Sequence, residues 1–241
     1  MKILSIDTAS NICGVSILED DQLICNMDTD TGRTHSENLM PLIEQAFNKT
    51  GLSLKNIDLI TCDIGPGSFT GIRIGVATTK AFNDSLNIPC VGVSSLEALA
   101  YNLKDTINEN DVICSIIDCK NNNCYFALYQ KKNTILSNLI EPQAESVEVC
   151  LSILKSYCED TLKNASIYFI GDGSEIFKSF IQETFPDARF ASADLNNLNS
   201  YSLGIAGLEH FNNGSISEEV LPLYLKKPQA QRLLEEKEKK D

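Results

Sequence analysis

Hydrophobic and polar residues in the first hundred positions form short apolar runs bounded by turn residues, followed by segments with apolar residues three or four apart. The short runs predict a meander of three strands, and the longer segments predict helices that alternate with further strands. The expected elements are strands Met1–Asp7, Ile12–Leu18 and Gln22–Met27, helix Ser36–Thr50, strand Ile57–Ile64, helix Gly71–Leu86, strand Pro89–Val93 and helix Ser94–Leu103. This half therefore has the predicted order βββαβαβα.

The second half begins with the same order. We expect strands Asp111–Asp118, Cys124–Gln130 and Thr134–Ile140, helix Val147–Tyr157, strand Ser166–Ile170, and helices Glu175–Glu183 and Ser200–Phe211. A shift of 111 residues aligns Ile6, Asp7, Asn11 and Cys13 with Ile117, Asp118, Asn122 and Cys124, in hairpins that we expect to be of equal length. We therefore predict an N-terminal lobe at 1–104, a C-terminal lobe at 105–225 and a charged, frayed or disordered tail at 226–241.

A duplicated βββαβαβα unit is the α/β architecture of the two-lobed actin, hexokinase and Hsp70 (ASKHA) superfamily. Proteins of that superfamily normally bind ATP in the cleft between their lobes. A fold by itself does not give a function, so the residues at the predicted strand ends have to decide whether this chain does the same.

Composition narrows the setting in which the protein works. The 241 residues are 43% hydrophobic, but no apolar run approaches a membrane span, and no secretory signal precedes the first strand. We therefore expect a cytoplasmic protein without a membrane role. Its nine cysteines, an odd number mostly in apolar runs, are expected to be reduced. The formal charge of −13 is unfavourable for holding RNA, so another subunit should hold most of any RNA substrate.

A glycine-rich loop is the most distinctive segment of the sequence. It comprises Gly65, Pro66, Gly67, Ser68, Phe69, Thr70 and Arg73. Its backbone amides could serve a phosphate, but the Lys-Ser or Lys-Thr pair of a P-loop is absent and the glycine spacing misses the dinucleotide fingerprint by one residue. We favour a tight turn before a helix whose small residues Gly71, Gly75 and Thr79 let another helix approach closely.

Asp7 and Asp118 end the first strand of each predicted lobe, where an active ATPase of this architecture places a metal-linked carboxylate. Neither is followed by the glycine that a phosphate-binding hairpin needs, because the sequences continue Thr8-Ala9-Ser10 and Cys119-Lys120-Asn121. We favour carboxylates that accept hydrogen bonds from turn amides, while a catalytic role stays open.

No metal site is predicted. His35 lies before the first long helix, but Leu39 occupies the position four residues later that a helical metal pair requires. We expect His35 to form hydrogen bonds at the helix entry. The cysteines lack the spacing of zinc ligands, and no serine stands in a nucleophile elbow, so no catalytic residue is predicted.

These residues closely resemble the TsaB (YeaZ) family over nearly the whole chain. The matching segments are MKILSIDTAS at the start, Arg33-x-His35-Ser36-Glu37-x-Leu39-x-Pro41, the loop GPGSFTGIRIG, Val91-Gly92-Val93-Ser94-Ser95-Leu96, and PLYLKKPQA from Pro222 to Ala230. One segment departs from the family: the usual Ile-Asp-Ala-Arg of the second lobe is Ile117-Asp118-Cys119-Lys120 here.

The resemblance implies an inactive paralogue of TsaD, which transfers a threonylcarbamoyl group from an adenylate intermediate to the exocyclic amine of an adenosine beside the anticodon of certain tRNAs. It implies pairing with TsaD, addition of the ATPase TsaE, and tRNA contact only through the complex. A homodimer of the isolated chain and a nucleotide at the shared interface are left open, and no cofactor of its own is expected. The alternative is an active ATP-dependent phosphotransferase or hydrolase of the ASKHA fold.

The pairing surface is predicted on the first two long helices. The expected partner-binding residues are His35, Ser36, Leu39, Met40, Ile43 and Phe47 on the first, and Gly71, Ile72, Gly75, Val76 and Thr79 on the second. The alternative is that both helices use these residues to cover their own sheet. On the first interpretation, Gly75→Arg or Met40→Glu should leave a folded monomer that no longer binds TsaD.

Overall fold

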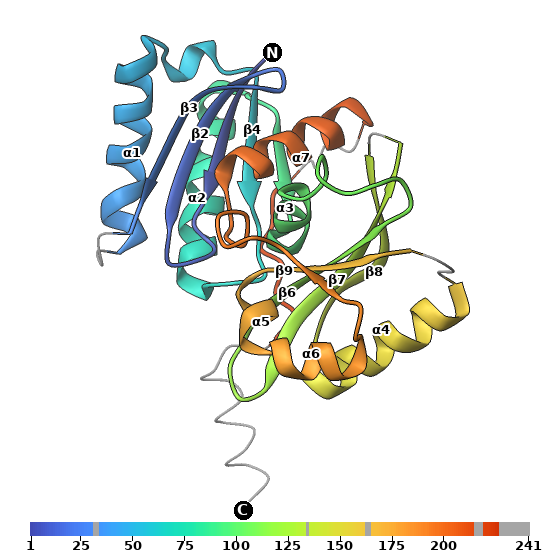
Figure 1. The fold of residues 1–241 in the computed structure, drawn as a ribbon. Helices are drawn as coiled ribbons and strands as arrows, with labels where there is room; N and C mark the ends of the chain where they lie inside the picture. Colours follow the sequence, from blue (N-terminus) through green and yellow to red (C-terminus); the bar gives the residue numbers. More distant parts are fainter. Residues whose placement is uncertain (31–33, 134, 162–164, 215–218, 227–241) are drawn as a thin grey trace, which may run out of the picture.

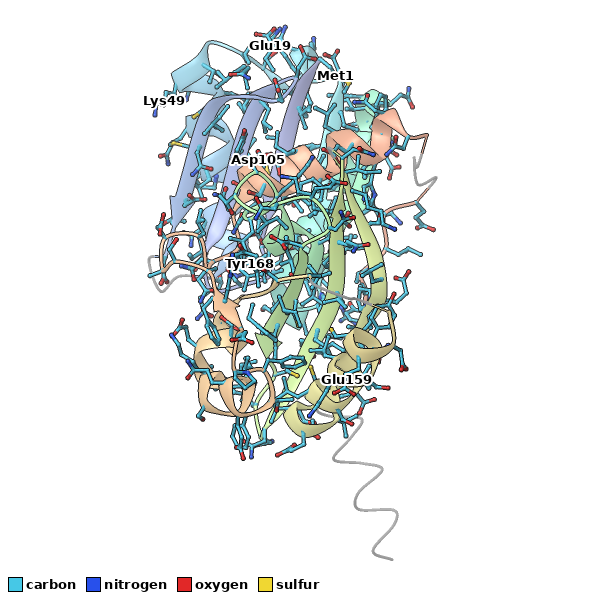
Figure 2. The ribbon with its side chains drawn as sticks, turned by 45° about the vertical axis from the view of Figure 1, so that its right-hand side comes forward. Met1, Glu19, Lys49, Asp105, Glu159 and Tyr168 are labelled. Carbon is cyan, nitrogen blue, oxygen red and sulfur yellow. The ribbon has the colours of Figure 1, made fainter. Side chains whose placement is uncertain are left out.

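The computed structural model describes residues 1–30, 34–133, 135–161, 165–214 and 219–226 of the 241-residue chain. The chain forms two lobes, each built on a five-stranded sheet (Figure 1). In Figure 2, Met1, Glu19 and Lys49 lie at the outer end of the first lobe, and Glu159 lies at the opposite end of the molecule.

The first sheet has the order β3-β2-β1-β4-β5. Its strands are β1 (Lys2–Asp7), β2 (Cys13–Glu19), β3 (Gln22–Thr29), β4 (Leu59–Asp63) and β5 (Cys90–Val93). β1 pairs antiparallel with β2 and parallel with β4, which places the ends of β1 and β4 side by side. Helices α1 (His35–Thr50) and α2 (Phe69–Leu86) cover one face, and α7 (Ser200–Asn212) covers the other.

The sequence accounts for where α1 begins and ends. The Glu37 carboxylate accepts a hydrogen bond from the backbone N–H of Thr34, 3.1 Å away, so an unpaired amide at the helix start is satisfied. Gly51 ends the helix in the left-handed conformation that suits glycine, with φ at 69°. Between these ends, Leu39, Ile43 and Ala46 are buried against the sheet.

The second sheet has the same order, β8-β7-β6-β9-β10. Its strands are β6 (Val112–Asp118), β7 (Asn123–Lys132), β8 (Ile135–Ser146), β9 (Ile167–Ile170) and β10 (Arg189–Phe190). Its helices are α4 (Val147–Thr161), α5 (Asp172–Ile176) and α6 (Lys178–Thr184), and a short 3₁₀ turn, η1 (Leu54–Asn56), precedes β4 in the first lobe. The predicted duplication is therefore confirmed in the strand order.

Several details of the prediction were wrong. The hairpins differ in length, because Asp7 pairs with Gly14 across residues 8–13, whereas Asp118 pairs with Cys124 across residues 119–123. The helix expected at Glu175–Glu183 is divided at Phe177, which is 3% exposed and turns into the core of the second lobe. Strand β10 was not predicted, since two residues are too short to show an alternating pattern.

Two helices cross between the halves of the chain. Helix α3 (Ser95–Tyr101), from the first half, packs on β6 and β7, while α7, from the second half, packs on β1 and β2. The two helices also contact each other, and the hydroxyl of Tyr101 donates to Glu209 over 2.6 Å. The lobes are therefore tied by packing as well as by the chain.

The chain returns to the first lobe through residues 219–226, which we call the C-terminal segment. Val220 is 4% exposed within the first lobe's core, and the backbone N–H of Leu223 donates to the carbonyl of Ile64 over 2.7 Å. The tail predicted at 226–241 lies outside the described residues apart from Lys226. Among the described residues, no helix combines the length and hydrophobicity needed to cross a membrane.

Candidate functional site

The turn after β1 is closed around a buried carboxyl group. Asp7 is 2% exposed, and its Oδ1 accepts a hydrogen bond from the backbone N–H of Ala9 over 2.9 Å. Burial raises the pKa of Asp7 from 3.8 to about 7, and this bond only partly opposes the rise. The predicted hydrogen bond from a turn amide to the Asp7 carboxyl group is confirmed.

The glycine-rich loop packs directly on this turn. The backbone N–H of Ser68 donates to the carbonyl of Ala9 over 2.7 Å, and Thr8 Oγ1 donates to the carbonyl of Gly71 over 2.8 Å. A methyl group at Gly67 would overlap the Ala9 carbonyl, and one at Gly71 would overlap the Thr8 carbonyl. Glycine is required at both positions because two backbones meet there, so the loop fills the space beside the Asp7 turn.

Loop amides that could have bound a phosphate have partners inside the protein. The Ser68 amide is used by Ala9, the Gly65 amide donates to Asp63 Oδ1 over 2.7 Å, and the Gly71 amide donates to Ser68 Oγ over 3.2 Å. These hydrogen bonds therefore favour a packing role for the loop over phosphate binding.

Asp63, at the end of β4, is a second buried carboxyl group that the sequence analysis did not single out. It is 1% exposed, and Ser95 Oγ donates to its Oδ1 over 2.6 Å. Burial, and then the negative charge of Asp7, hold its pKa well above the usual range. Its position at a strand end before the glycine-rich loop matches that of Asp7 in its own lobe, and this signal could have identified it.

The turn after β6 is more open. The Asp118 Oδ1 accepts from the backbone N–H of Lys120 over 2.9 Å, which confirms a turn-stabilising role for this carboxylate as well. Lys120, Asn121 and Asn122 follow in left-handed conformations and are exposed. The amide of Asp118 itself donates to Asp172 Oδ1 over 2.9 Å.

A cleft of about 640 Å³ lies between the lobes. It brings the start of the glycine-rich loop (Pro66, Gly67 and Ser68) to the turn of the second lobe (Asp118, Cys119 and Lys120). Asp7 is not among its lining residues, because the loop covers it. Asp118 and Asp172 line the cleft from the second lobe and Asp30 lines it from the first, whereas Asp7 and Asp63 are buried outside it.

The two histidines lie apart. His35 is the first residue of α1, and its Nε2 lies 2.8 Å from the carbonyl oxygen of Ser10, as expected for a hydrogen bond at the helix entry. His210, on α7, lies 2.7 Å from Glu97 Oε1 on α3, a contact that the sequence analysis did not foresee. Across the described parts of the chain, no group of three or more His, Cys, Asp or Glu side chains is arranged to hold a metal ion. All nine cysteines are free thiols, and seven of them are buried.

Most of the predicted partner-binding residues face the first lobe's own core. The buried ones are Leu39, Ile43, Gly71, Ile72, Gly75, Val76 and Thr79, whereas His35 and Phe47 are half-buried and Ser36 and Met40 are exposed. A Cβ at Gly75 would lie 2.5 Å from Thr8 Oγ1, so the expectation that Gly75→Arg leaves a folded monomer is wrong. The buried set covers the sheet from within, and a partner can be reached directly by the outward residues.

The outward face of α2 carries Thr70, Arg73, Ala77 and Ala81, all exposed. The Arg73 guanidinium lies 3.9 Å from the centre of the Phe69 ring, and its Nε donates to the hydroxyl of Tyr224 over 2.7 Å. Tyr224 belongs to the C-terminal segment and is 42% exposed. The sequence analysis had named Phe69, Thr70 and Arg73 only as parts of the glycine-rich loop.

Comparisons with known proteins show the family to which this chain belongs. A family model described as "TsaD: tRNA N6-adenosine threonylcarbamoyltransferase" matches residues 28–233. The tRNA threonylcarbamoyladenosine biosynthesis protein TsaB of Bacillus subtilis (strain 168) is 32% identical over 183 residues, 76% of this chain and 76% of that protein. The chain belongs to the TsaB family. The resemblance seen in the sequence is therefore confirmed.

Solved structures support the fold. YeaZ from Pseudomonas aeruginosa superposes with a TM-score of 0.74 at 22% identity, covering 93% of this chain and 99% of that one. The ROK hexokinase from Thermus thermophilus superposes with a TM-score of 0.55 at 10% identity, covering 88% of this chain and 100% of that one. The predicted two-lobed ASKHA fold is confirmed.

The departure from the usual TsaB pattern lies in the turn after β6. Lys120 Nζ forms an ion pair with Asp118 Oδ2 over 2.6 Å, and Lys226 Nζ lies 2.9 Å from Cys119 Sγ. The lysine that stands where the family usually has arginine is thus paired within its own turn.

Proposed function

We propose that this chain is a non-catalytic scaffold subunit of the machinery that makes N6-threonylcarbamoyladenosine in tRNA. Membership of the TsaB family supports the process, because the B. subtilis relative is named as a tRNA threonylcarbamoyladenosine biosynthesis protein. In this proposal, the chain pairs with a TsaD-type threonylcarbamoyltransferase in the cytoplasm, and the ATPase TsaE joins the pair.

One observation carries the non-catalytic part of the proposal. The space beside the Asp7 turn, where an active ATPase of this fold would bring phosphate, is filled by the backbone of the glycine-rich loop at Gly67 and Gly71. Asp7 is buried and excluded from the cleft lining, so it is poorly placed to organise a magnesium ion. A chain without the first-lobe half of a phosphate site is suited to binding a partner protein.

The outward face of α1 and α2 supplies the surface for that role. Met40 on α1 is 51% exposed, and Ala77 is exposed on α2, the helix that contacts α1 in the layer covering the first sheet. The outer face of this helix pair exposes Met40, Ala77 and Ala81 among polar side chains, and such a pair can pack against an equivalent pair as a four-helix bundle. The family model of the transferase itself matches this chain, so a partner of that type would offer the equivalent helices.

The net negative charge of this chain supports tRNA binding by the partner. The chain has 20 basic and 33 acidic residues, so it gains little from releasing the counterions of RNA. In this proposal the isolated chain binds tRNA weakly, needs no cofactor of its own, and meets a nucleotide at most at the surface it shares with the transferase.

Co-purification with the TsaD-type subunit from the same cells tests the pairing. We expect the unaltered chain to co-elute with that subunit in size-exclusion chromatography. We also expect it to restore the modified nucleoside in cells that lack this chain. Met40→Glu and Ala77→Arg should keep the monomer's melting temperature but abolish both, because a buried unpaired charge costs several kcal/mol of association. Phe180→Glu, at a side chain of the second lobe that is 42% exposed, is the control.

Calorimetry of the isolated chain with magnesium and ATP tests the non-catalytic part. We expect no binding in the low micromolar range and no turnover. Tight binding, or turnover that Asp7→Ala abolishes, would contradict this part of the proposal, and the turnover would favour an active ATPase of this fold instead.

A further inference from the structure

Helix α2 has a neighbour on each side. Helix α1 lies on β2 and β3, α2 lies on β4, and the C-terminal segment lies beyond α2 towards β5, where a Cβ at Gly92 would be 3.5 Å from Val220. Glu219 forms an ion pair with Lys80 of α2, while the Tyr224 ring lies tilted against that of Phe69, with their centres 4.8 Å apart, near the start of the same helix. The segment therefore runs antiparallel along α2.

The three elements present different side chains to the outside. On α2 the exposed positions are mostly small, at Thr70, Ala77 and Ala81. On either side stand larger apolar side chains, Met40 of α1 at 51% exposure and Leu221 of the C-terminal segment at 57%. Small residues along a helix let another helix approach closely, and larger apolar neighbours add contact area on both sides.

Arg73 is a cation on the outward face of α2. Its guanidinium lies over the Phe69 ring, 3.9 Å from the ring centre, and it is also held by the bond from Nε to the hydroxyl of Tyr224, whose ring centre is 5.6 Å away. It forms no ion pair within the described parts of the chain. A guanidinium held in this way loses little side-chain entropy on binding, and its preferred partner is a carboxylate.

We infer that the docking face extends from α1 and α2 onto the C-terminal segment, and that its occupant is an α-helix of the paired transferase which lies along α2 and presents an aspartate or glutamate to Arg73. This rests on the proposed pairing. Tyrosine and arginine are, with tryptophan, the residue types enriched among those that dominate binding energy at interfaces, and here they contact each other on the exposed surface. Leu221 and Tyr224 would then fix the position of the partner helix from the side opposite Met40.

The test compares affinities of full-length variants for the purified TsaD-type subunit by calorimetry. Leu221→Glu and Tyr224→Ala are matched with Ile176→Glu and Phe180→Ala in the second lobe, whose side chains have closely similar exposures of 54% and 42%. We expect Leu221→Glu and Tyr224→Ala to weaken binding by about tenfold or more and the controls by less than about twofold. Leu221 is mostly exposed, so its substitution also tests the contact if Tyr224→Ala loosens the segment.

Arg73→Gln tests the carboxylate. It should weaken binding. It should also make the affinity depend less on salt between 0.05 and 0.5 M, because added salt screens the attraction within a charge pair. Tyr224→Phe keeps the ring and removes only the hydroxyl, so it should fall between the unaltered chain and Tyr224→Ala. An unchanged salt dependence in Arg73→Gln would overturn the carboxylate partner.

The outcomes separate this inference from the proposed function. If Met40→Glu abolishes the complex while Leu221→Glu and Tyr224→Ala behave like their controls, the pairing stands and the extension onto the C-terminal segment is wrong. If none of the three weakens binding, the proposed pairing surface fails as well. If Leu221→Glu changes only the self-association of the chain in sedimentation, the occupant is a second copy and the inference about the transferase is overturned.

Discussion

The two sheets have the same strand order, but the loops that follow β4 and β9, the strands next to each central strand, differ. In the first lobe β4 leads to Gly65, and in the second β9 leads to Gly171, both at φ of 100°. After Gly65 the chain continues through residues 66–68 before α2 begins, whereas α5 begins directly after Gly171. The three additional residues contain the backbone that reaches the Asp7 turn, so a short insertion separates a closed turn from an open one.

The helices after these loops differ as well. α2 has 18 residues and exposes a face of small side chains, whereas its counterpart in the second lobe is divided into α5 with 5 residues and α6 with 7. The first lobe has a long, outward helix above a closed turn, and the second has short helices beside the cleft. A difference in one connection thus accompanies a closed turn and a long helix in one lobe, and an open turn and two short helices in the other.

The largest expected effect comes from breaking the closed turn. Gly71→Ala places a methyl group on the Thr8 carbonyl, and backbone cannot move aside as a side chain can. We expect a loss of more than about 3 kcal/mol in the free energy of unfolding, measured by urea denaturation. The control is Gly51→Ala, at a left-handed position with nothing within 4 Å of the added methyl, which should cost only about 1 kcal/mol. Equal losses would mean that the loop does not press on the turn.

A smaller effect concerns the carboxyl group inside that turn. The pKa of Asp7 is raised in the folded protein, so its neutral form is favoured there and folding is favoured at low pH. Stability from this group is fully present below 3.8 and is lost as the pH rises to about 7, by less than the loss expected from Gly71→Ala. Asp7→Asn should therefore be more stable than the unaltered chain at pH 8 and have a flatter stability profile between pH 4 and 8.

Asp118→Asn is the matched change in the open turn. It removes the same kind of carboxylate, which also accepts a turn amide, but from a side chain beside the cleft. We expect a change of less than about 1 kcal/mol at pH 8, because Asp118 lines the cleft and its ion-pair partner Lys120 is 79% exposed. The comparison between the lobes would be undermined if the two substitutions had the same effect on the pH profile.

Sequence patterns were sufficient for the element order, because alternating strands and capped helices are local features. They failed where tertiary packing decides. Phe177 ends α5 since its side chain has to enter the second lobe's core, although the surrounding residues suit one continuous helix. Strand β8 was predicted to end at Ile140 but continues to Ser146 through Pro142, which an edge strand tolerates because it has one unpaired side.

The site was predicted in part for the same reason. The absence of glycine after Asp7 and Asp118 correctly indicated turn-stabilising carboxylates. The small residues Gly71 and Gly75 correctly indicated a close approach, but helical spacing cannot tell whether the approaching element belongs to a partner or to the same lobe. Here it is the Asp7 turn. The contact of Tyr224 with Arg73 joins positions 151 residues apart, and no local pattern reports such a contact.

The smallest effect concerns the tie between the lobes, where His210 of α7 meets Glu97 of α3. Its hydrogen bond to Glu97 raises the pKa of His210 above 6.5, although partial burial opposes the rise. The resulting stability is fully present below 6.5 and is lost as the pH rises through the folded value, by less than about 1 kcal/mol because the imidazole is 33% exposed. This has the same sign as the Asp7 effect, so the comparison should be made in the Asp7→Asn background. There we expect His210→Gln to lower stability at pH 5.5 and to have less effect at pH 8.5.

Imidazole titration by NMR gives a second measurement, since the chain has only two histidines and the variant assigns the signal. A His210 pKa at or below 6.5, or an equal loss at both pH values, would mean that the ion pair does not contribute to the tie and that α3 and α7 are joined by packing and by the Tyr101 and Lys104 contacts to Glu209.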